Sequence, residues 1–412
     1  MRYLICAVTL ALALAPENAA AQQQARPRAR DVGVVVGIFP PGQYNAITDV
    51  PGVKVGQTTV IQGDSVRSGV TAVVPHEGNV YNEPVPGWVY VGNGYGKMTG
   101  ETQVREFGEI ESPIMLTCTL CVWTVSRALV QYMLEHDAPG TALHTINPIV
   151  GETNDGTLSD MWRDPVKYEH VKAALDNAAS GPVAEGSVGA GTGTNALGFK
   201  AGIGTSSRKL PASLGGYTVG VLVQANFGGD LTINGAPVGR ELGNYPFRAQ
   251  IQQQSGAIPF EDPLKDDGSC MVIVATDAPL SGHSLERIGR RAMMGLSRTG
   301  SYAANSSGDY VIAFSTAKSV RRVRNSPTPL QVEELLNPNQ AQLFEAVIEA
   351  TQEAVYNALF KATTVTGKGA TREAMPVDRV VEIMKKYNVL NWDKTLPPFK
   401  PAPAPAPAAT PR

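Results

Sequence analysis

The sequence predicts an α+β or layered α/β protein, a single domain in which helices cover packed sheets. Short apolar runs rich in β-branched residues are typical of buried strands, and they occur at residues 34–39, 70–75, 219–227, 270–275 and 309–314. Apolar residues at helical spacing predict helices near residues 121–135, 165–179, 284–297, 340–361 and 376–389. Because these helices do not alternate regularly with the strands, a doubly wound parallel sheet is not expected.

Both ends of the chain differ in composition from the segment 22–396 between them. Arg2, the apolar stretch LICAVTLALALA and three alanines at 19–21 predict a secretory signal peptide of residues 1–21. We therefore expect a periplasmic or secreted protein whose mature chain begins at Gln22. Residues 397–412 are rich in Pro and Ala and cannot bury apolar surface, which predicts an extended, disordered tail.

The overall charge and hydropathy exclude some classes of partner. The 412 residues carry a formal net charge of -2 at pH 7, and no basic-aromatic cluster supplies a local field for nucleic acid. After the signal peptide, no stretch approaches the roughly 20 apolar residues of a membrane span. With 43% hydrophobic residues the chain can bury a large core. We expect a globular protein with no nucleic-acid partner and no membrane partner.

Cysteine and histidine give no support for a metal site. The mature chain keeps Cys118, Cys121 and Cys270, with no flanking histidine pattern for zinc, and the five histidines are scattered. The stretch around CTLC has an apolar helical pattern, which favours two core-facing thiols at Cys118 and Cys121. A redox pair is the alternative in an oxidising compartment. We expect no metal and no cofactor.

Two S-x-x-K matches offer one route to a serine hydrolase. Ser206–Lys209 and Ser315–Lys318 have the spacing found in penicillin-recognising acyltransferases, but neither is accompanied by a K-T-G or S-D-N element. The chain has no G-x-S-x-G elbow. The glycine-rich stretches at 92–100 and 189–198 lack the dinucleotide-binding spacing after a strand, so they are interpreted as turns.

A different serine stands at the start of an apolar strand. In KDDGSCMVIVATD a turn-forming loop ends at Gly268, and Ser269 leads directly into CMVIVA. The simplest interpretation is a serine that ends a loop. If the protein cut its own Gly268–Ser269 bond, however, Ser269 would gain an α-amine with a typical pKa of about 7.7–8.0 beside its own hydroxyl. That amine could act as the base for the hydroxyl without a histidine, and Gly268 has no side chain to obstruct the attack.

Several blocks of sequence, in a fixed order, extend this hypothesis to most of the chain. The blocks are RARDVGVVVGIFPPGQYNAITDVPGVKVGQTTV, GETNDGTLSDM, GTGTNALGFKAGIGTSSR, VGVLVQANFGGDL, DDGSCMVIVATDAPL and SGDYVIAFSTA. With them the chain resembles the L-aminopeptidase/D-amidase/D-esterase family of N-terminal-nucleophile enzymes, which includes the β-aminopeptidases, over roughly residues 28–370. The resemblance implies a four-layer α-β-β-α sandwich, cut autoproteolytically into a large chain (22–268) and a small chain (269–396, followed by the tail).

The resemblance also implies roles for four residues. Ser269 falls at the position of the autoproteolytic nucleophile, and Ser307 falls where a second serine contacts the amine. Asp309 falls where an acidic residue, often Glu, holds that network in place, and its shorter side chain departs from the usual pattern. Asn226 falls where a side-chain amide faces the oxyanion of the tetrahedral intermediate, a donor worth roughly 3 to 4 kcal/mol in other enzymes.

The GETNDG block supplies candidates for substrate binding. An aminopeptidase must recognise the free ammonium group of its substrate, and a partly buried carboxylate does so through a charge-assisted hydrogen bond. Glu152 is the first candidate for this role, with Asp155 as the alternative and Asn154 in the same loop. Thr157 is expected to line the pocket.

Three hypotheses follow from the sequence. The leading one is a self-processing serine aminopeptidase that acts on short peptides, amides or esters with a free amine. The others are an S-x-x-K serine hydrolase and a non-catalytic exported binding protein that keeps the fold. For the first, the resemblance implies that both cleavage products stay in one core and assemble into a homo-oligomer, commonly of four heterodimers. The preference among L-, D- and β-amino acids stays open.

Overall fold

The computed structural model describes residues 26–136, 145–252, 268–324 and 326–396. The predicted signal peptide, the predicted tail and residues 253–267 before Gly268 lie outside these ranges. No helix within them combines the length and the apolar character that a transmembrane span requires. In the same ranges no group of three His, Cys, Asp or Glu side chains is arranged to hold a metal ion.

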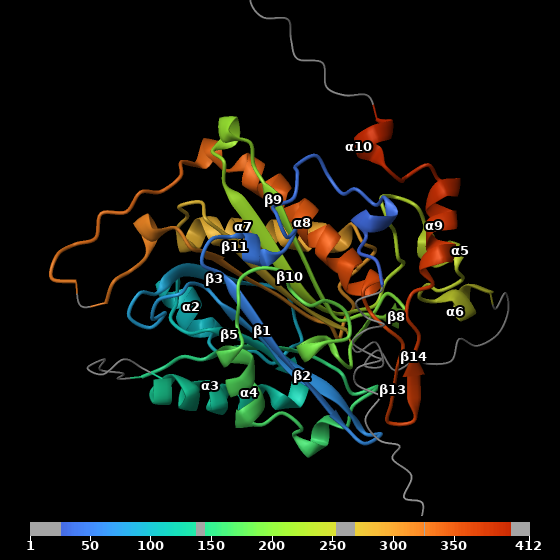
Figure 1. Ribbon diagram of the computed structural model, residues 1–412, viewed down its shortest axis with the longest axis horizontal. Coiled ribbons are helices and arrows are strands. Elements are labelled where there is room, and N and C mark those ends of the chain that lie inside the picture. The colour runs from blue at the N-terminus through green and yellow to red at the C-terminus, as the bar shows by residue number, and fades with distance from the viewer. Residues whose placement is uncertain (1–25, 137–144, 253–267, 325, 397–412) are drawn as a thin grey trace, which may run out of the picture.

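Two sheets face each other at the centre of the protein, and both contain parallel and antiparallel neighbours (Figure 1). The larger sheet has the order β4-β3-β12-β11-β10-β9, formed by Glu109–Ile110, Val85–Gly94, Gly308–Ser315, Ser269–Thr276, Thr218–Asn226 and Ile203–Lys209. The smaller sheet has the order β1-β2-β5-β6, formed by Lys54–Gln62, Val66–Val74, Ile114–Cys118 and Ile149–Thr153. Four of the predicted strands are confirmed as β2, β10, β11 and β12.

Helices cover the outer face of each sheet (Figure 1). The larger sheet is covered by α7 (Gly282–Ser297) and α8 (Ala341–Phe360), and the smaller sheet by α3 (Val122–His136) and α4 (Tyr168–Asp176). The other helices are α2 (Glu101–Phe107), α5 (Val238–Glu241), α6 (Arg248–Gln252), α9 (Val377–Lys386) and α10 (Trp392–Thr395). Two hairpins are formed by β7 (Asn195–Ala196) with β8 (Phe199–Lys200), and by β13 (Val365–Gly367) with β14 (Ala370–Arg372). All five predicted helices are confirmed, as α3, α4, α7, α8 and α9.

Three hydrophobic clusters separate the layers. Successive side chains of a strand point to opposite faces, so Val272 and Val274 of β11 pack with α7 and α8, whereas Met271 and Ile273 pack with the smaller sheet. The third cluster lies between the smaller sheet and α3 and α4. Every residue of β11 is buried, which explains its unbroken apolar run. Burial of each Val, Ile or Met side chain of this strand contributes about 1.5–3 kcal/mol. The order of layers is helix, sheet, sheet, helix.

The strand predicted at residues 34–39 is not present. The backbone N–H groups of Ile38 and Phe39 donate to the carboxylate of Glu349, at 2.8 and 3.2 Å, instead of to a neighbouring strand. Gly37 also has a φ of +75°, which interrupts an extended backbone. A buried glutamate of α8 therefore accepts the backbone hydrogen bonds of this apolar segment. An apolar run alone does not reveal such a partner.

The favoured interpretation of Cys118 and Cys121 as free thiols in a helix is wrong. Cys118 ends β5, a 3₁₀ turn spans Thr119–Cys121, and α3 begins only at Val122. Both cysteines are buried in the core, as expected, but they form a disulfide with their Cα atoms 5.1 Å apart. Thr119 and Leu120 lie between the two cysteines that the bond joins.

Candidate active site

Strand pairing places Ser269 beside Asn226. Ser269 is the first residue of β11, and the register pairs it with Asn226 at the end of the antiparallel strand β10 and with Gly308 at the start of the parallel strand β12. Its side chain is buried, and the residue is only 3% exposed. The predicted nucleophile therefore lies at one end of the central strands, where three segments of the chain meet.

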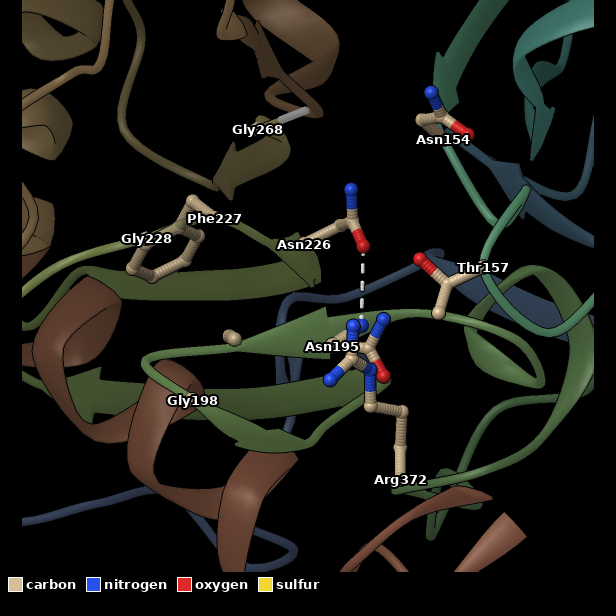
Figure 2. Close-up of a pocket in the computed structure, with 10 residues that line it drawn as sticks. Asn154, Thr157, Asn195, Gly198, Asn226, Phe227, Gly228, Gly268 and Arg372 are labelled. Carbon is tan, nitrogen blue, oxygen red and sulfur yellow. Dashed lines mark hydrogen bonds between the residues drawn. The ribbon is translucent and has the colours of Figure 1, made fainter. Parts of the chain in front are cut away.

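Two N–H donors converge on the hydroxyl oxygen of Ser269. The backbone N–H of Asn154 lies 3.2 Å from Ser269 Oγ, and Nδ2 of Asn226 lies 3.5 Å from it. The N–H of Asn195 donates to Asn226 Oδ1 at 3.0 Å (Figure 2), which turns the amide so that its own donor faces Ser269. Donors fixed in this way can stabilise negative charge that develops next to the serine.

The Gly268–Ser269 bond is held by Gly308 and Ser307. The carbonyl oxygen of Gly268 accepts a hydrogen bond from the N–H of Gly308 at 3.2 Å, which polarises the carbonyl. A Cβ atom on Gly268 would lie 2.9 Å from Ser307 Oγ, so only glycine allows this close approach without a shift. From the sequence, the absence of a side chain at Gly268 was explained only by the access that it gives Ser269. In the structure, the close approach of Ser307 is a second reason.

Ser307 and Asp309 form a buried pair next to this bond. Ser307 Oγ donates to Asp309 Oδ1 at 2.8 Å, so the shorter aspartate does reach the serine. Burial raises the pKa of Asp309 to about 6, and the hydrogen bond from Ser307 opposes this shift. The carboxylate is therefore ionised at neutral pH and becomes protonated in mild acid.

Asp309→Asn is expected to move the acidic limb of the kcat/KM–pH profile to lower pH. Activity that requires the ionised carboxylate falls as the pH drops through its pKa of about 6, and asparagine does not titrate there. A nearby carboxylate also raises the pKa of an amine, so its removal lowers the pKa of the predicted Ser269 α-amine and shifts the limb in the same direction. The measurement is kcat/KM from acidic to alkaline pH.

Asp277→Asn provides the matched control for this profile. Asp277 follows the opposite end of β11, burial raises its pKa too, and its Oδ1 accepts from the N–H of Thr218 at 2.7 Å. Its replacement should leave the acidic limb in place. If the Asp309→Asn profile is also unchanged, Asp309 has only a structural role.

Glu152 and Ser269 line one cavity of about 200 Å³, here called the amine cavity. Glu152 is almost fully buried; its Oε1 accepts from the N–H of Lys97 at 2.9 Å, and its Oε2 accepts from the hydroxyl of Thr119. Burial raises the pKa of Glu152, and these two hydrogen bonds oppose the shift. The rest of the lining is formed by Tyr95, Lys97, Thr119, Leu120, Asn154, Met161, Trp162, Gly268 and Ser306.

The other residues of the GETNDG block are divided between different roles. The side chain of Asn154 accepts from the N–H of Gly156 at 2.8 Å and so stabilises a turn, while its backbone N–H faces Ser269. Asp155 is buried, and burial raises its pKa to about 7. It does not line the amine cavity, nor does it line a second, neighbouring cleft whose lining includes Asn226. Thr157 lines that cleft (Figure 2). Of the two acids, Glu152 is the one that faces a cavity beside Ser269.

The two S-x-x-K matches do not form serine–lysine pairs in the described part of the chain. Ser206 Oγ donates to Asn45, and Lys209 donates to the carbonyl of Gly216. Ser315 Oγ donates to the carbonyl of Ala278 at 2.6 Å, at the end of β12 opposite to Gly308. Neither serine makes a hydrogen bond with a lysine side chain within the described ranges.

Several groups of the site were not anticipated from the sequence. The donors from Asn195, Gly308 and Lys97 are backbone N–H groups, which no side-chain pattern reveals. Thr119 is a side chain, and its place between Cys118 and Cys121 is the one signal that could have drawn attention to it.

This fold and site define a class of protein. The solved structure of the L-aminopeptidase D-Ala-esterase/amidase from Ochrobactrum anthropi, a prototype for the serine aminopeptidases and a variant of the Ntn hydrolase fold, matches with a TM-score of 0.78 and 36% identity, covering 89% of this chain and 100% of that one. The present protein accordingly has the α+β Ntn hydrolase fold in this variant form. It is a hydrolase of the serine aminopeptidase class.

The family follows from the sequence itself. Residues 45–372 match the model of peptidase family S58, and the chain belongs to this family. The beta-peptidyl aminopeptidase BapA of Sphingosinicella microcystinivorans is 42% identical over 377 residues, which cover 88% of this chain and 93% of that protein. A beta-aminopeptidase structure from Burkholderia sp. matches with a TM-score of 0.76 and 39% identity, over 87% of this chain and 99% of that one.

Proposed function

We propose that the protein cuts its own Gly268–Ser269 bond. Ser269 Oγ attacks the carbonyl carbon of Gly268, the Ser269 nitrogen leaves that carbon, and the hydroxyl proton passes to the nitrogen. Water then hydrolyses the resulting ester, which gives a carboxylate on Gly268 and a free amine and hydroxyl on Ser269. The hydrogen bond from Gly308 to the Gly268 carbonyl and the two donors at Ser269 Oγ support this step.

The processed enzyme then releases the N-terminal residue of a short peptide, amide or ester. The α-amine of Ser269 accepts the hydroxyl proton, Oγ attacks the substrate carbonyl, and Asn226 donates to the oxyanion. The proton passes to the leaving group, and an acyl ester remains on Ser269. Water, deprotonated by the same amine, hydrolyses this ester and frees the amino acid. Ser307 and Asp309 hold the network around the amine.

One observation carries this function: the carboxylate of Glu152 and the hydroxyl of Ser269 lie in the same cavity. When Glu152 binds the ammonium group of a substrate, the carbonyl group of the same substrate residue can reach Ser269. An aminopeptidase requires this arrangement. The relatives named for β-peptides and β-amino acids support N-terminal β-amino acids as substrates. The same proposal includes export to the periplasm or beyond, and assembly of the processed chains into a larger homo-oligomer.

Hydrolysis is expected to require a free amine on the substrate. A panel of L-, D- and β-amino acid p-nitroanilides, each also in N-acetylated form, tests this requirement and identifies the preferred residue. Glu152→Gln keeps the size of the side chain but removes the charge, so we expect KM to rise at least about 10-fold with a smaller effect on kcat.

Two results would contradict the proposal. Equal hydrolysis of acetylated and free substrates would mean that the amine cavity does not recognise the ammonium group. An unchanged protein that remains in one chain and hydrolyses none of the panel would instead favour a non-catalytic protein that keeps the fold.

A further inference from the structure

A second cavity adjoins the amine cavity, and among the described residues that line it Arg372 is the one with an ionisable side chain. This cleft has a volume of about 220 Å³, shares Asn154 and Gly268 with the amine cavity, and also contains Asn226. Its remaining lining is neutral except for Arg372, as Figure 2 shows together with Asn195 and Thr157. We call it the Arg372 cleft.

The backbone of Arg372 is held in place on both sides. Arg372 ends β14, where it pairs with Val365 of β13, and the carbonyl of Glu373 accepts from the N–H of Lys200 in β8 at 2.8 Å. At the tip of the same hairpin, Lys368 Nζ donates to the carbonyl of Gly156 at 3.0 Å. The hairpin is therefore fastened to the loop that follows β6, and the arginine side chain extends from it towards Asn195 (Figure 2).

The guanidinium of Arg372 has no hydrogen-bond or ion-pair partner among the described residues. The adjacent acid, Glu373, forms no ion pair with Arg372 among the described residues, and its carboxylate accepts instead from the hydroxyl of Thr364 at 2.9 Å. In the uncut chain, no other charged side chain of the residues that the structure describes lines the cleft. An arginine in this setting offers its forked donors to an anion, and carboxylate and phosphate groups both match them in geometry; of these two, a peptide substrate carries a carboxylate.

The path of a bound peptide determines which carboxylate can reach this position. With the ammonium group at Glu152 and the scissile carbonyl between Ser269 and Asn226, the acyl part fills the amine cavity. The leaving part then extends into the Arg372 cleft, which begins at Asn226 and Gly268. In a dipeptide the leaving part is one amino acid that carries a free α-carboxylate.

We propose that Arg372 binds the C-terminal carboxylate of dipeptide substrates, so that the enzyme selects dipeptides over peptides with a blocked C-terminus. The proposal rests on the function proposed above and adds the class of leaving group. Arg372 acts as a specificity residue and takes no part in the proton transfers.

The test compares β-alanyl-L-alanine and L-alanyl-L-alanine with their C-terminal amides. For the unchanged protein we expect the free acids to be the better substrates. Arg372→Gln should lower kcat/KM for the acids about 10- to 100-fold, mainly through KM, and leave the amides within about 2-fold. Arg372→Lys should retain part of the preference, because it keeps the charge but not the forked donors.

Arg379→Gln is the matched control, since this exposed arginine of α9 lines neither cavity and its replacement removes the same charge. It should keep the preference for the acids. Equal losses on acids and amides in Arg372→Gln, or no loss on either, would overturn the proposal while the aminopeptidase function stands. The proposal would also be overturned if the only defect of Arg372→Gln were slower cleavage of the Gly268–Ser269 bond, seen on a denaturing gel. Such a defect is conceivable because Gly268 lines the same cleft. If the unchanged protein hydrolyses the p-nitroanilides but none of the four peptides, this inference fails while the aminopeptidase function stands; if it hydrolyses neither set, both fail.

Discussion

Ser269→Ala is expected to give a folded protein that remains in one chain and has lost at least about 10⁴-fold of its activity. The hydroxyl is needed both for self-cleavage and for attack on the substrate, and both oxygen contacts that hold it disappear with it. Because 412 residues have a mass of 43.6 kDa, the unchanged protein should give chains of about 26 and about 15 kDa on a denaturing gel. Sequencing of the smaller chain should read Ser-Cys-Met-Val-Ile.

Ser315→Ala is the control for this experiment. Ser315 is also a buried serine of the larger sheet, it ends β12, and it belongs to one of the S-x-x-K matches. We expect this variant to be processed and active. Full activity in Ser269→Ala would overturn the nucleophile assignment, and loss of activity confined to Ser315→Ala would favour the S-x-x-K mechanism. Native size-exclusion chromatography checks that each variant is folded and that the two chains stay together.

Asn226→Ala is expected to lower kcat about 10²- to 10³-fold with a much smaller change in KM. The Asn195 N–H orients the amide before substrate binds, so its donor acts on charge that appears only in the transition state. Asn226→Asp should be no better, because it keeps the size but places a negative charge next to the oxyanion. Steady-state kinetics of both variants separate kcat from KM.

Gln224→Ala distinguishes loss of a catalytic donor from loss of a buried amide. Gln224 lies two residues earlier on β10 and on the same face, and its Nε2 donates to the carbonyls of Thr117 and Ala190 at 3.0 and 2.9 Å. Its replacement should lower the melting temperature and leave kcat nearly unchanged. A change confined to KM in Asn226→Ala would assign Asn226 to substrate binding.

Three of the strands that the sequence predicted are buried along their whole length. All residues of β10, β11 and β12 are buried, so their apolar runs are long and uninterrupted. By contrast, β9 has the sequence IGTSSRK and was missed, although six of its seven residues are buried. Its Arg208 forms ion pairs with Glu349 and Glu353 of α8, and such tertiary partners cannot be read from a local pattern.

The site could be predicted from the sequence only as far as its side chains. Local chemistry made Ser269 a candidate nucleophile, whereas the resemblance supplied Ser307, Asp309 and Asn226 and made Glu152 a candidate for the ammonium group. The N–H groups of Asn154 and Gly308 carry no residue-specific signal, because every residue except proline has one. Arg372 comes to the cleft through a hairpin distant in sequence from β10 and β11, so its position depends on the tertiary fold.

The pairing of β10 with β11 links the evolution of the two segments that the proposed cleavage separates. Val223 lies opposite Val272, and Leu222 lies opposite Ile273, so a larger side chain on one strand alters the space available on the other. A substitution before residue 268 can therefore be compensated by one after residue 269. Although they would be separate polypeptides in the mature enzyme, the two segments would have to remain complementary along this strand pair. Exchange of one segment for its counterpart from a distant relative should succeed only when residues of the other strand are exchanged with it.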